Sequence, residues 1–218
     1  YETIVKFFAP AKIKDSFAFS YKPPPLGGCP DCRAILDEEA EFARQGLDLR
    51  SASCPWRVTD ANRDYQLAPS YLRLLVVPRQ VSDEELAEVA EFRSKRRIPV
   101  LSWRHRSGAT ITRGSQPMVG VFSSRSAKDE KLIESIRTAN DPAKMLFILD
   151  SRPQANSVMN RAVGGGYENT SFYQHTVLEF LNMPNIHGVR ESFLKLREAC
   201  GAARTRGHTS YNFFTAVG

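Results

Sequence analysis

The chain has 218 residues, enough for one α/β domain, and its 42% hydrophobic and 25% charged residues are ordinary for a globular protein. Its formal net charge of +6 suits an anionic partner, either a phosphate-bearing lipid surface or a nucleic acid. No apolar run approaches the ~20 residues that a membrane-spanning helix needs, and the first residues do not form a secretory signal.

The first half of the chain is uneven before it becomes regular. Residues 17–21 alternate like a short strand that a run of prolines ends, and Asp37–Gln45 predicts a short helix that ends at Gly46. Leu74–Val77 then predicts a buried strand with Pro78 as its stop.

A helix start follows this strand. Ser82 precedes an acidic first turn, and Glu85 stands three residues further on, which is the pattern of a capping box. The helix has one apolar face, formed by Leu86, Val89, Ala90 and Phe92. Ile98–Trp103 predicts the next strand, and strand, helix and strand at this short spacing favour a parallel sheet.

The same alternation continues in the second half. Apolar patterns predict three helices, at Lys128–Ala139, from Pro153 onward and at Glu191–Ala199, and two strands, at Met145–Leu149 and Val177–Leu181. Three consecutive glycines at 164–166 end the second of these helices. The sequence therefore predicts an α/β fold with a mixed or mostly parallel sheet flanked by helices.

A basic stretch lies between Phe92 and Arg113. It contains no Asp or Glu and seven Lys or Arg residues: Arg93, Lys95, Arg96, Arg97, Arg104, Arg106 and Arg113. One interpretation is an anion-facing surface for phosphoinositide headgroups or an acidic membrane. The other is a solvated helix end and loop, which the sequence by itself favours. No recognition motif accompanies the charge, so we expect no nucleic-acid partner.

The four cysteines predict neither a disulfide framework nor a metal site. Cys29 and Cys32 form a Cys-x-x-Cys pair, but tetrahedral zinc needs two further ligands and no second pair follows. Cys200 and Arg206 have the spacing of a phosphatase loop, in which a thiolate attacks phosphorus and an arginine holds the phosphate oxygens. A helix is expected before Cys200 where such a loop requires a strand, so we interpret the spacing as a chance match.

Several strings form a set when they are taken in order. They are Ile98–Trp103, Ala109–Arg113, Ser115–Pro117, Asp150–Pro153, Asn160–Glu168, Asn185–His187 and Arg190–Ser192. In this order they resemble the myotubularin phosphatases. The start of that domain is resembled by two further segments, at residues 17–24 and 56–67. The resemblance identifies residues 17–200 as the N-terminal part of a myotubularin phosphatase domain. Residues 1–16 are then expected to lead in from an upstream domain, and residues 201–218 to form a divergent tail.

This resemblance implies a fold and a function. The fold is cysteine-phosphatase-like, in the protein tyrosine phosphatase superfamily, here incomplete. The function is removal of the 3-phosphate from phosphatidylinositol 3-phosphate and phosphatidylinositol 3,5-bisphosphate, without metal or other cofactor, at a cytoplasmic location peripheral to endosomal membranes. The implied partners are phosphoinositide headgroups, an acidic membrane surface, and myotubularin relatives in a homo- or hetero-oligomer. Carried over residue by residue, the headgroup contacts fall on Asn160, Asn185 and Ile186.

The family's signature, His-Cys-Ser-Asp-Gly-Trp-Asp-Arg, is not among the 218 residues. It belongs after a further helix and strand, so we expect a truncated chain with no catalytic residue and no activity of its own. Because the sheet would then lack its central strand, we also expect marginal stability. The alternative function is a non-enzymatic phosphoinositide-binding or regulatory partner of an active relative.

Overall fold

A computed structural model describes residues 37–140 and 145–205. The chain divides into two compact units, Tyr1–Glu41 and Phe42–Gly218. Helix α3 (Glu38–Arg44) confirms the predicted short helix, and Asp37 accepts a hydrogen bond from the Ala40 N–H at its start. The strand expected at 17–21 lies outside the described residues, as do Cys29 and Cys32.

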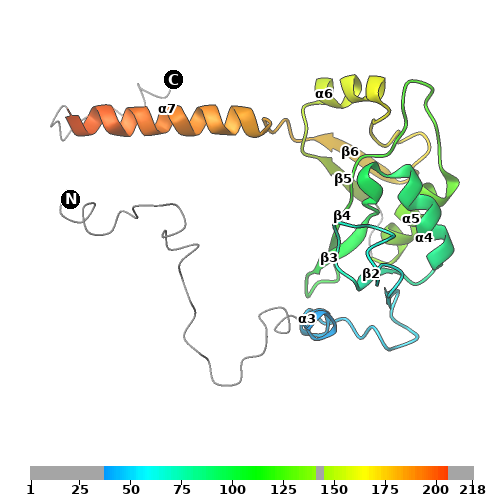
Figure 1. Ribbon diagram of the computed structural model, residues 1–218. Coiled ribbons are helices and arrows are strands. Elements are labelled where there is room, and N and C mark those ends of the chain that lie inside the picture. Colours follow the sequence, from blue (N-terminus) through cyan, green and yellow to red (C-terminus); the bar gives the residue numbers. More distant parts are fainter. Residues whose placement is uncertain (1–36, 141–144, 206–218) are drawn as a thin grey trace, which may run out of the picture. The chain divides into compact units, whose positions relative to one another are not determined.

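The described strands of the second unit form three pairs (Figure 1). β1 (Trp56–Thr59) and β2 (Leu75–Pro78) are antiparallel, β3 (Val100–Arg104) and β4 (Thr110–Arg113) are antiparallel, and β5 (Leu146–Asp150) and β6 (Thr176–Phe180) are parallel. Of the two predicted alternatives, mixed or mostly parallel, the mixed one holds, and the described strands pair as three separate two-stranded sheets. A parallel pair needs a long crossover connection, whereas β3 and β4 are joined only by the short turn at 105–109.

The helices follow the predicted order with shifted ends. They are α4 (Asp83–Phe92), α5 (Ala127–Thr138), α6 (Gln154–Met159) and α7 (Ile186–Thr205), with short 3-10 helices η3 (Ser94–Arg96) and η4 (Asn160–Val163). The capping box is confirmed, because the Ser82 hydroxyl accepts from the Glu85 N–H and the Glu85 carboxylate accepts from the Ser82 N–H. α4 ends at Phe92, so the cations that follow do not form its last turn.

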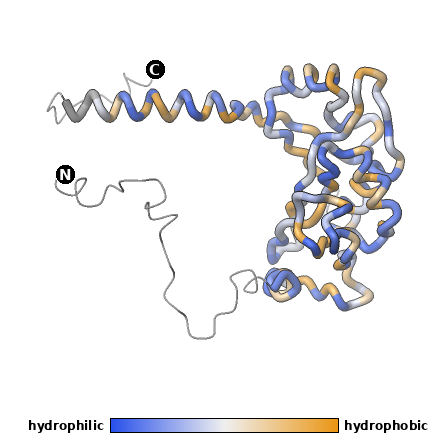
Figure 2. The backbone as a smooth tube through the Cα atoms, in the orientation of Figure 1, coloured by the Kyte–Doolittle hydropathy of each residue, from blue (hydrophilic) through white to orange (hydrophobic). Residues whose placement is uncertain are grey.

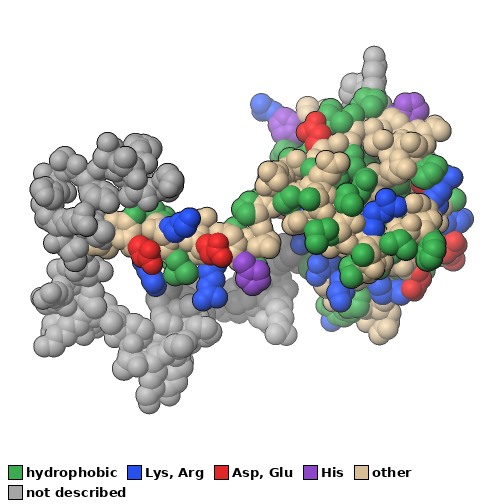
Figure 3. Space-filling view, turned by 90° about the horizontal axis from the view of Figure 1, so that it is seen from above, with side chains coloured by type: hydrophobic (Ala, Val, Ile, Leu, Met, Phe, Trp, Pro, Cys, Tyr) green, Lys and Arg blue, Asp and Glu red, His purple; other side chains and the backbone are tan. Residues whose placement is uncertain are grey.

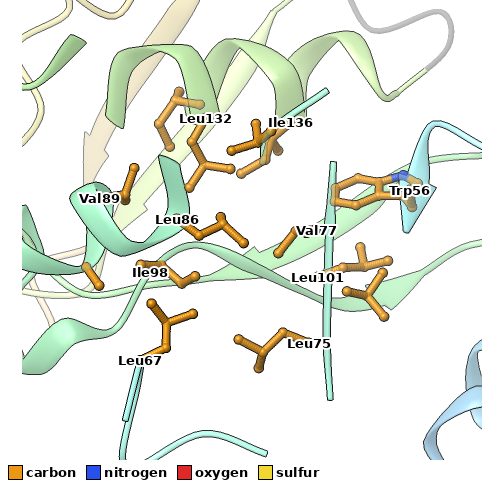
Figure 4. Close-up of a cluster of buried hydrophobic side chains, with 14 of the residues drawn as sticks. Trp56, Leu67, Leu75, Val77, Leu86, Val89, Ile98, Leu101, Leu132 and Ile136 are labelled. Carbon is orange, nitrogen blue, oxygen red and sulfur yellow. The ribbon is translucent and has the colours of Figure 1, made fainter. Parts of the chain in front are cut away.

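One cluster of buried apolar side chains joins β1 and β2 to α4 and α5 (Figure 4). α4 and α5 lie side by side, and the apolar faces that the sequence predicts for them meet there. The fully buried members include Leu86 and Val89 from α4 and Leu132 and Ile136 from α5. Each such side chain contributes about 1.5–3 kcal/mol on leaving water. The helical periodicity in the sequence is thus explained by this shared core.

α7 differs from the other helices. Its tube alternates between hydrophilic and hydrophobic colours along successive turns (Figure 2), and its exposed apolar side chains are Ile186, Val189, Phe193 and Leu196. Their spacing of three and four residues places them on one stripe of the helix. No helix within 37–140 or 145–205 is both long and apolar enough to cross a membrane.

Arg93 is the most deeply buried cation of the basic stretch, with 3% of its surface exposed. Its Nε and Nη2 atoms donate to the two Asp129 carboxylate oxygens, each over 2.6 Å, and its Nη1 donates to the Ser115 carbonyl over 2.7 Å. The same Nη1 is ion-paired with Glu168, and the Tyr173 hydroxyl donates to Asp129 over 2.7 Å. One guanidinium thereby joins the end of α4, the loop after β4, the start of α5 and the loop before β6.

One buried cation in this cluster faces two carboxylates. Burial by itself would lower the pKa of Arg93, but the Asp129 and Glu168 carboxylates outweigh it and raise that pKa well above its ordinary value. Burial and the Asp129 charge raise the pKa of the Tyr173 hydroxyl, so it remains a donor at neutral pH. The donors of Arg93 are used by Asp129, Glu168 and Ser115, which agrees with the favoured interpretation that this cation serves a helix end and loop rather than an anion-facing surface.

Replacing Arg93 tests this cluster. Arg93→Ala leaves two buried carboxylates without their cation, and we expect the free energy of unfolding to fall by about 3–5 kcal/mol. Urea denaturation followed by circular dichroism measures it. Arg106→Ala is the matched control, because Arg106 is exposed and a surface substitution usually changes stability by about 0.5 kcal/mol or less. A loss from Arg93→Ala no larger than that of the control would contradict this prediction.

Glu85 gives the fold a pH dependence. Hydrogen bonds from Lys131 and then Lys128 lower its pKa from 4.5 to about 2. A lowered folded pKa contributes stability that is complete above about pH 4.5 and is lost as pH falls toward about 2. Both lysines are more than a third exposed, so solvent screening limits the effect to about 1 kcal/mol.

The readout is the difference between wild type and Glu85→Gln in urea midpoint, measured from pH 5.5 down to pH 3. Other carboxylates titrate equally in both proteins, so the difference reports Glu85. We expect the urea midpoint of wild type to lie above that of Glu85→Gln, and this difference to shrink as the pH falls. Parallel midpoint curves would show that the lysine pairs contribute nothing measurable.

Candidate functional site

A groove of about 440 Å³ lies between the segment around β4 and strand β5. One wall comes from Pro99, Thr112 and Gly114–Gln116, and the other comes from Leu146–Arg152. The remaining lining residues are Arg93, Ser94, Ile133, Asn160 and Glu168. Apolar side chains form much of the β5 wall, whereas the residues after β5 and the glutamine are polar. The groove therefore has an apolar floor along a strand and a polar end.

The edge of β5 that faces away from β6 has no strand neighbour among the described residues. The Leu146 N–H and the Asp150 carbonyl both bond to the β6 side. Since backbone direction alternates along a strand, the N–H and C=O groups of Phe147 and Leu149 are directed to the open edge. Both residues line the groove, and their side chains are more than half exposed. An open edge of this kind is a template for another strand.

Arg152 organises the polar end of the groove. Its Nε and Nη2 atoms donate to the Asp150 carboxylate, Nη2 also donates to the Gly166 carbonyl over 2.9 Å, and Nη1 donates to the Gln116 side-chain oxygen. Burial by itself would raise the pKa of Asp150, but the bonds from Arg152 and Ser157 outweigh it and lower that pKa. Asp150 is therefore ionised at neutral pH and holds Arg152 in place.

The glycine run at 164–166 lies so close to the 116–119 segment that side chains would not fit there. A Cβ on Gly166 would lie 2.9 Å from the Val119 Cβ, and a Cβ on Gly165 would lie 2.7 Å from the Gln116 amide nitrogen. Gly164 has a φ of +89°, which favours glycine at this helix end. The predicted helix break is confirmed, and its cause is contact with the 116–119 segment.

The structure separates the three residues that the resemblance assigns to headgroup binding. Asn160 ends α6, lines the groove, and its carbonyl accepts from the Gly165 N–H over 2.9 Å. Asn185 and Ile186 lie at the start of α7 and are not among the residues that line the groove. The Asn185 side-chain oxygen accepts from the His187 and Gly188 N–H groups over 3.0 and 3.2 Å, so it caps this helix.

The cysteines in the described residues do not form a reactive loop. Cys54 is buried, and Cys200 is exposed within α7, which continues without interruption to Thr205. A continuous helix cannot form the phosphate-cradling loop that Cys-x5-Arg chemistry needs. No group of three or more metal-binding side chains occurs in the described parts of the chain.

The basic stretch does not form one surface. Arg93 is buried, Arg96 donates to the Leu67 carbonyl and pairs with Glu91, and Arg104 donates to the carbonyls of Gln45 and Gly46. These contacts favour the interpretation of a helix end and loop that serve the fold.

Sequence reasoning assigned no role to Gln116 or Arg152, which join the groove walls. Both lie in strings that carry the family resemblance, and the spacing of Asp150 and Arg152 after a predicted strand was the available signal. Glu168 was likewise included in such a string without a role, because its partner Arg93 is 75 residues away in the sequence.

Comparison with known proteins gives a consistent result. The family model for the myotubularin-like phosphatase domain matches residues 16–217. The chain is 47% identical over 201 residues to the bovine phosphatidylinositol-3,5-bisphosphate 3-phosphatase MTMR2, which covers 91% of the chain and 30% of the relative. It is 45% identical over 201 residues to the chicken protein of that name, covering 91% of the chain and 34% of the relative. It is 46% identical over 166 residues to myotubularin from Xenopus laevis, covering 76% of the chain and 27% of the relative. The chain thus spans about a third or less of the length of these relatives.

The glycine contact makes a prediction about the groove wall. Gly166→Ala places a methyl group against Val119, and we expect a loss of about 1–3 kcal/mol in unfolding free energy from overpacking. Val119→Ala in the same chain should recover part of this loss by removing the atoms in conflict. Gly201→Ala is the control, because its Cβ meets no atom within 4 Å and alanine favours the helix. If the two substitutions change the unfolding free energy in a strictly additive way, the proposed contact is excluded.

Proposed function

Because the chain belongs to the myotubularin-like phosphatase family, we propose that it forms the headgroup-binding part of a phosphoinositide 3-phosphatase domain. The proposed substrates are phosphatidylinositol 3-phosphate and phosphatidylinositol 3,5-bisphosphate, the second in agreement with the name of the bovine relative. The observation that carries the proposal is the groove, which has a polar end at Asn160 and Arg152 and an open strand edge beside it.

Each proposed contact residue retains a group that can bind an inositol phosphate. The Asn160 amide can both donate to and accept from ring hydroxyls. The Asn185 side-chain oxygen is used as a helix cap, which leaves the amide N–H groups of the same side chain to serve as donors. The Ile186 N–H belongs to the first turn of α7, where helix N–H groups lack helical partners and favour an anion.

The reactive half of the site is proposed to come with another strand. In a cysteine phosphatase of the protein tyrosine phosphatase superfamily, a strand leads into the Cys-x5-Arg loop, and the open edge of β5 supplies the unpaired backbone groups that such a strand needs. The exposed apolar side chains of Phe147 and Leu149 support the proposal that further polypeptide packs there. By itself the chain is then a recognition element without a nucleophile.

Headgroup recognition is tested by titrating a soluble, short-chain phosphatidylinositol 3-phosphate into the chain and following the affinity by calorimetry. We expect Asn160→Ala to weaken binding by about tenfold, the cost of one good hydrogen bond to a charged group. Asn156→Ala is the matched control, because Asn156 is an exposed asparagine on α6 one turn earlier. Equal effects of the two substitutions would remove Asn160 from the site.

Completion of the site is tested by mixing the chain with the part of the bovine relative that follows the matched segment. We expect phosphate release from vesicles containing phosphatidylinositol 3-phosphate only in the mixture. Phe147→Pro removes one N–H from the open edge without affecting the bonds to β6, so it should abolish the release, whereas Phe147→Thr should retain most of it.

Two results would contradict the proposal. Phosphate release by the chain alone would show that it carries its own nucleophile. A stable complex that binds headgroup but releases no phosphate would favour the alternative, a non-enzymatic regulatory partner. A location peripheral to endosomal membranes in the cytoplasm follows from the proposed substrates and stays part of this proposal.

A further inference from the structure

The most exposed large apolar side chain within the described residues is Phe122, at 93%. It lies in the turn between β4 and α5, next to Val121, which is 62% exposed. A phenylalanine normally contributes its surface to a core, and this turn is surrounded by water. Neither the groove nor its proposed partner strand accounts for Phe122, which does not line the groove.

The turn that carries Phe122 is held rigidly. The Ser124 N–H donates to the Val119 carbonyl over 2.8 Å, and the Gly120 N–H donates to the Gly165 carbonyl over 3.0 Å. Arg161 donates from Nε to the Gly120 carbonyl and from Nη2 to the Ser123 hydroxyl, over 3.2 and 2.6 Å. Bonds on both sides of Phe122 therefore fix the direction in which it is presented.

Further apolar side chains come from the neighbouring segment. η4 follows α6, and its Val163 is 79% exposed, while Met159 at the end of α6 is also largely exposed. The bonds of Arg161 and Gly165 to the 120–123 turn bring these two segments together. We name the surface formed by Val121, Phe122, Met159 and Val163 the apolar tip.

The two segments that carry the apolar tip contain only basic charged residues, although Glu130 lies beside Arg125 and Arg161. Residues 118–128 include Arg125 and Lys128, residues 154–167 include Arg161, and neither segment contains Asp or Glu. Arg125 and Lys128 pair with Glu130 and Glu85, respectively. Arg161 donates to a carbonyl and a hydroxyl, and it forms no ion pair with a carboxylate among the described residues. Figure 3 looks onto the side that carries α6 and shows hydrophobic side chains on this face, with Lys and Arg and some Asp and Glu among them.

We propose that the apolar tip inserts into the interface of an anionic lipid bilayer, with Arg161 at the level of the lipid phosphates. An apolar protrusion beside an unmatched cation fits a membrane interface, where acyl chains accept the phenyl ring and headgroups attract the guanidinium. A protein partner would instead need a broad, flat or concave apolar area.

The proposed insertion rests on the proposed function, because it concerns how the headgroup-binding groove would reach the membrane. Asn160 and Val163 are the two ends of η4, so one turn of backbone links the groove to the apolar tip. Insertion at Val163 would bring the polar end of the groove to the headgroup layer.

The test uses flotation of the 218-residue chain with vesicles of phosphatidylcholine and phosphatidylserine that contain no phosphoinositide. We expect binding that weakens with added salt and that falls about tenfold in Phe122→Ser, as expected for loss of a buried phenyl ring. Phe193→Ser is the matched control, because Phe193 is an exposed phenylalanine on α7. We expect it to change binding less than twofold, in line with an exposed residue outside the contact.

A second variant reports insertion directly. Phe122→Trp should shift its emission to shorter wavelength when the vesicles are added, and acyl chains brominated near the headgroup should quench it. Circular dichroism of each variant shows whether its helix content equals that of wild type.

Several results would overturn the proposal. They are no binding by wild type, equal binding by Phe122→Ser, a loss in Phe193→Ser as large as that in Phe122→Ser, and no change in Phe122→Trp emission. If Phe122→Ser abolishes self-association in sedimentation and leaves vesicle binding intact, the tip is a protein interface. Since these vesicles lack phosphoinositide, failure here is independent of headgroup binding at Asn160, which Phe122→Ser should leave unchanged.

Discussion

The buried ion pair between Arg93 and Asp129 is the constraint on which the rest of the structure depends. A carboxylate in an apolar interior is tolerated only when a cation and hydrogen bonds compensate its lost hydration. Arg93 supplies both, and its remaining donor reaches the Ser115 carbonyl. That bond fixes the segment after β4, so Gln116 faces Arg152 across the groove. The groove wall is thus positioned by a charge cluster that lies beneath it and shares Glu168 with it.

The polar end and the apolar side of the groove differ in whether their hydrogen-bonding groups have partners. Its polar end is satisfied internally, because Asp150, Gln116 and the Gly166 carbonyl accept the donors of Arg152. The apolar side still has unpaired groups, since one edge of β5 presents backbone N–H and C=O groups without a strand partner among the described residues. A satisfied polar end can be rigid before any ligand arrives, whereas an open strand edge gains stability only when another strand pairs with it. This difference supports the proposed division between a preformed headgroup site and a separately supplied reactive loop.

The glycine run connects these features with the apolar tip. Gly165 and Gly166 allow the 116–119 segment to approach the loop before β6, and the turn that carries Phe122 continues from that segment. Arg161 then binds the turn from the other side. A single close approach of two backbones therefore positions both the polar end of the groove and the exposed apolar surface.

The sequence by itself determined the local features of this protein. The capping box at Ser82 and Glu85, the apolar faces of α4 and α5, and the helix break at the glycines depend on neighbours within a few residues, and the structure confirms them. The motifs also identified the family. Only the tertiary structure decided the fate of Arg93 and the contact of Gln116 with Arg152. The partners of Arg93 lie 36 and 75 residues away, and no local pattern specifies such contacts because they form only when separate elements share one core.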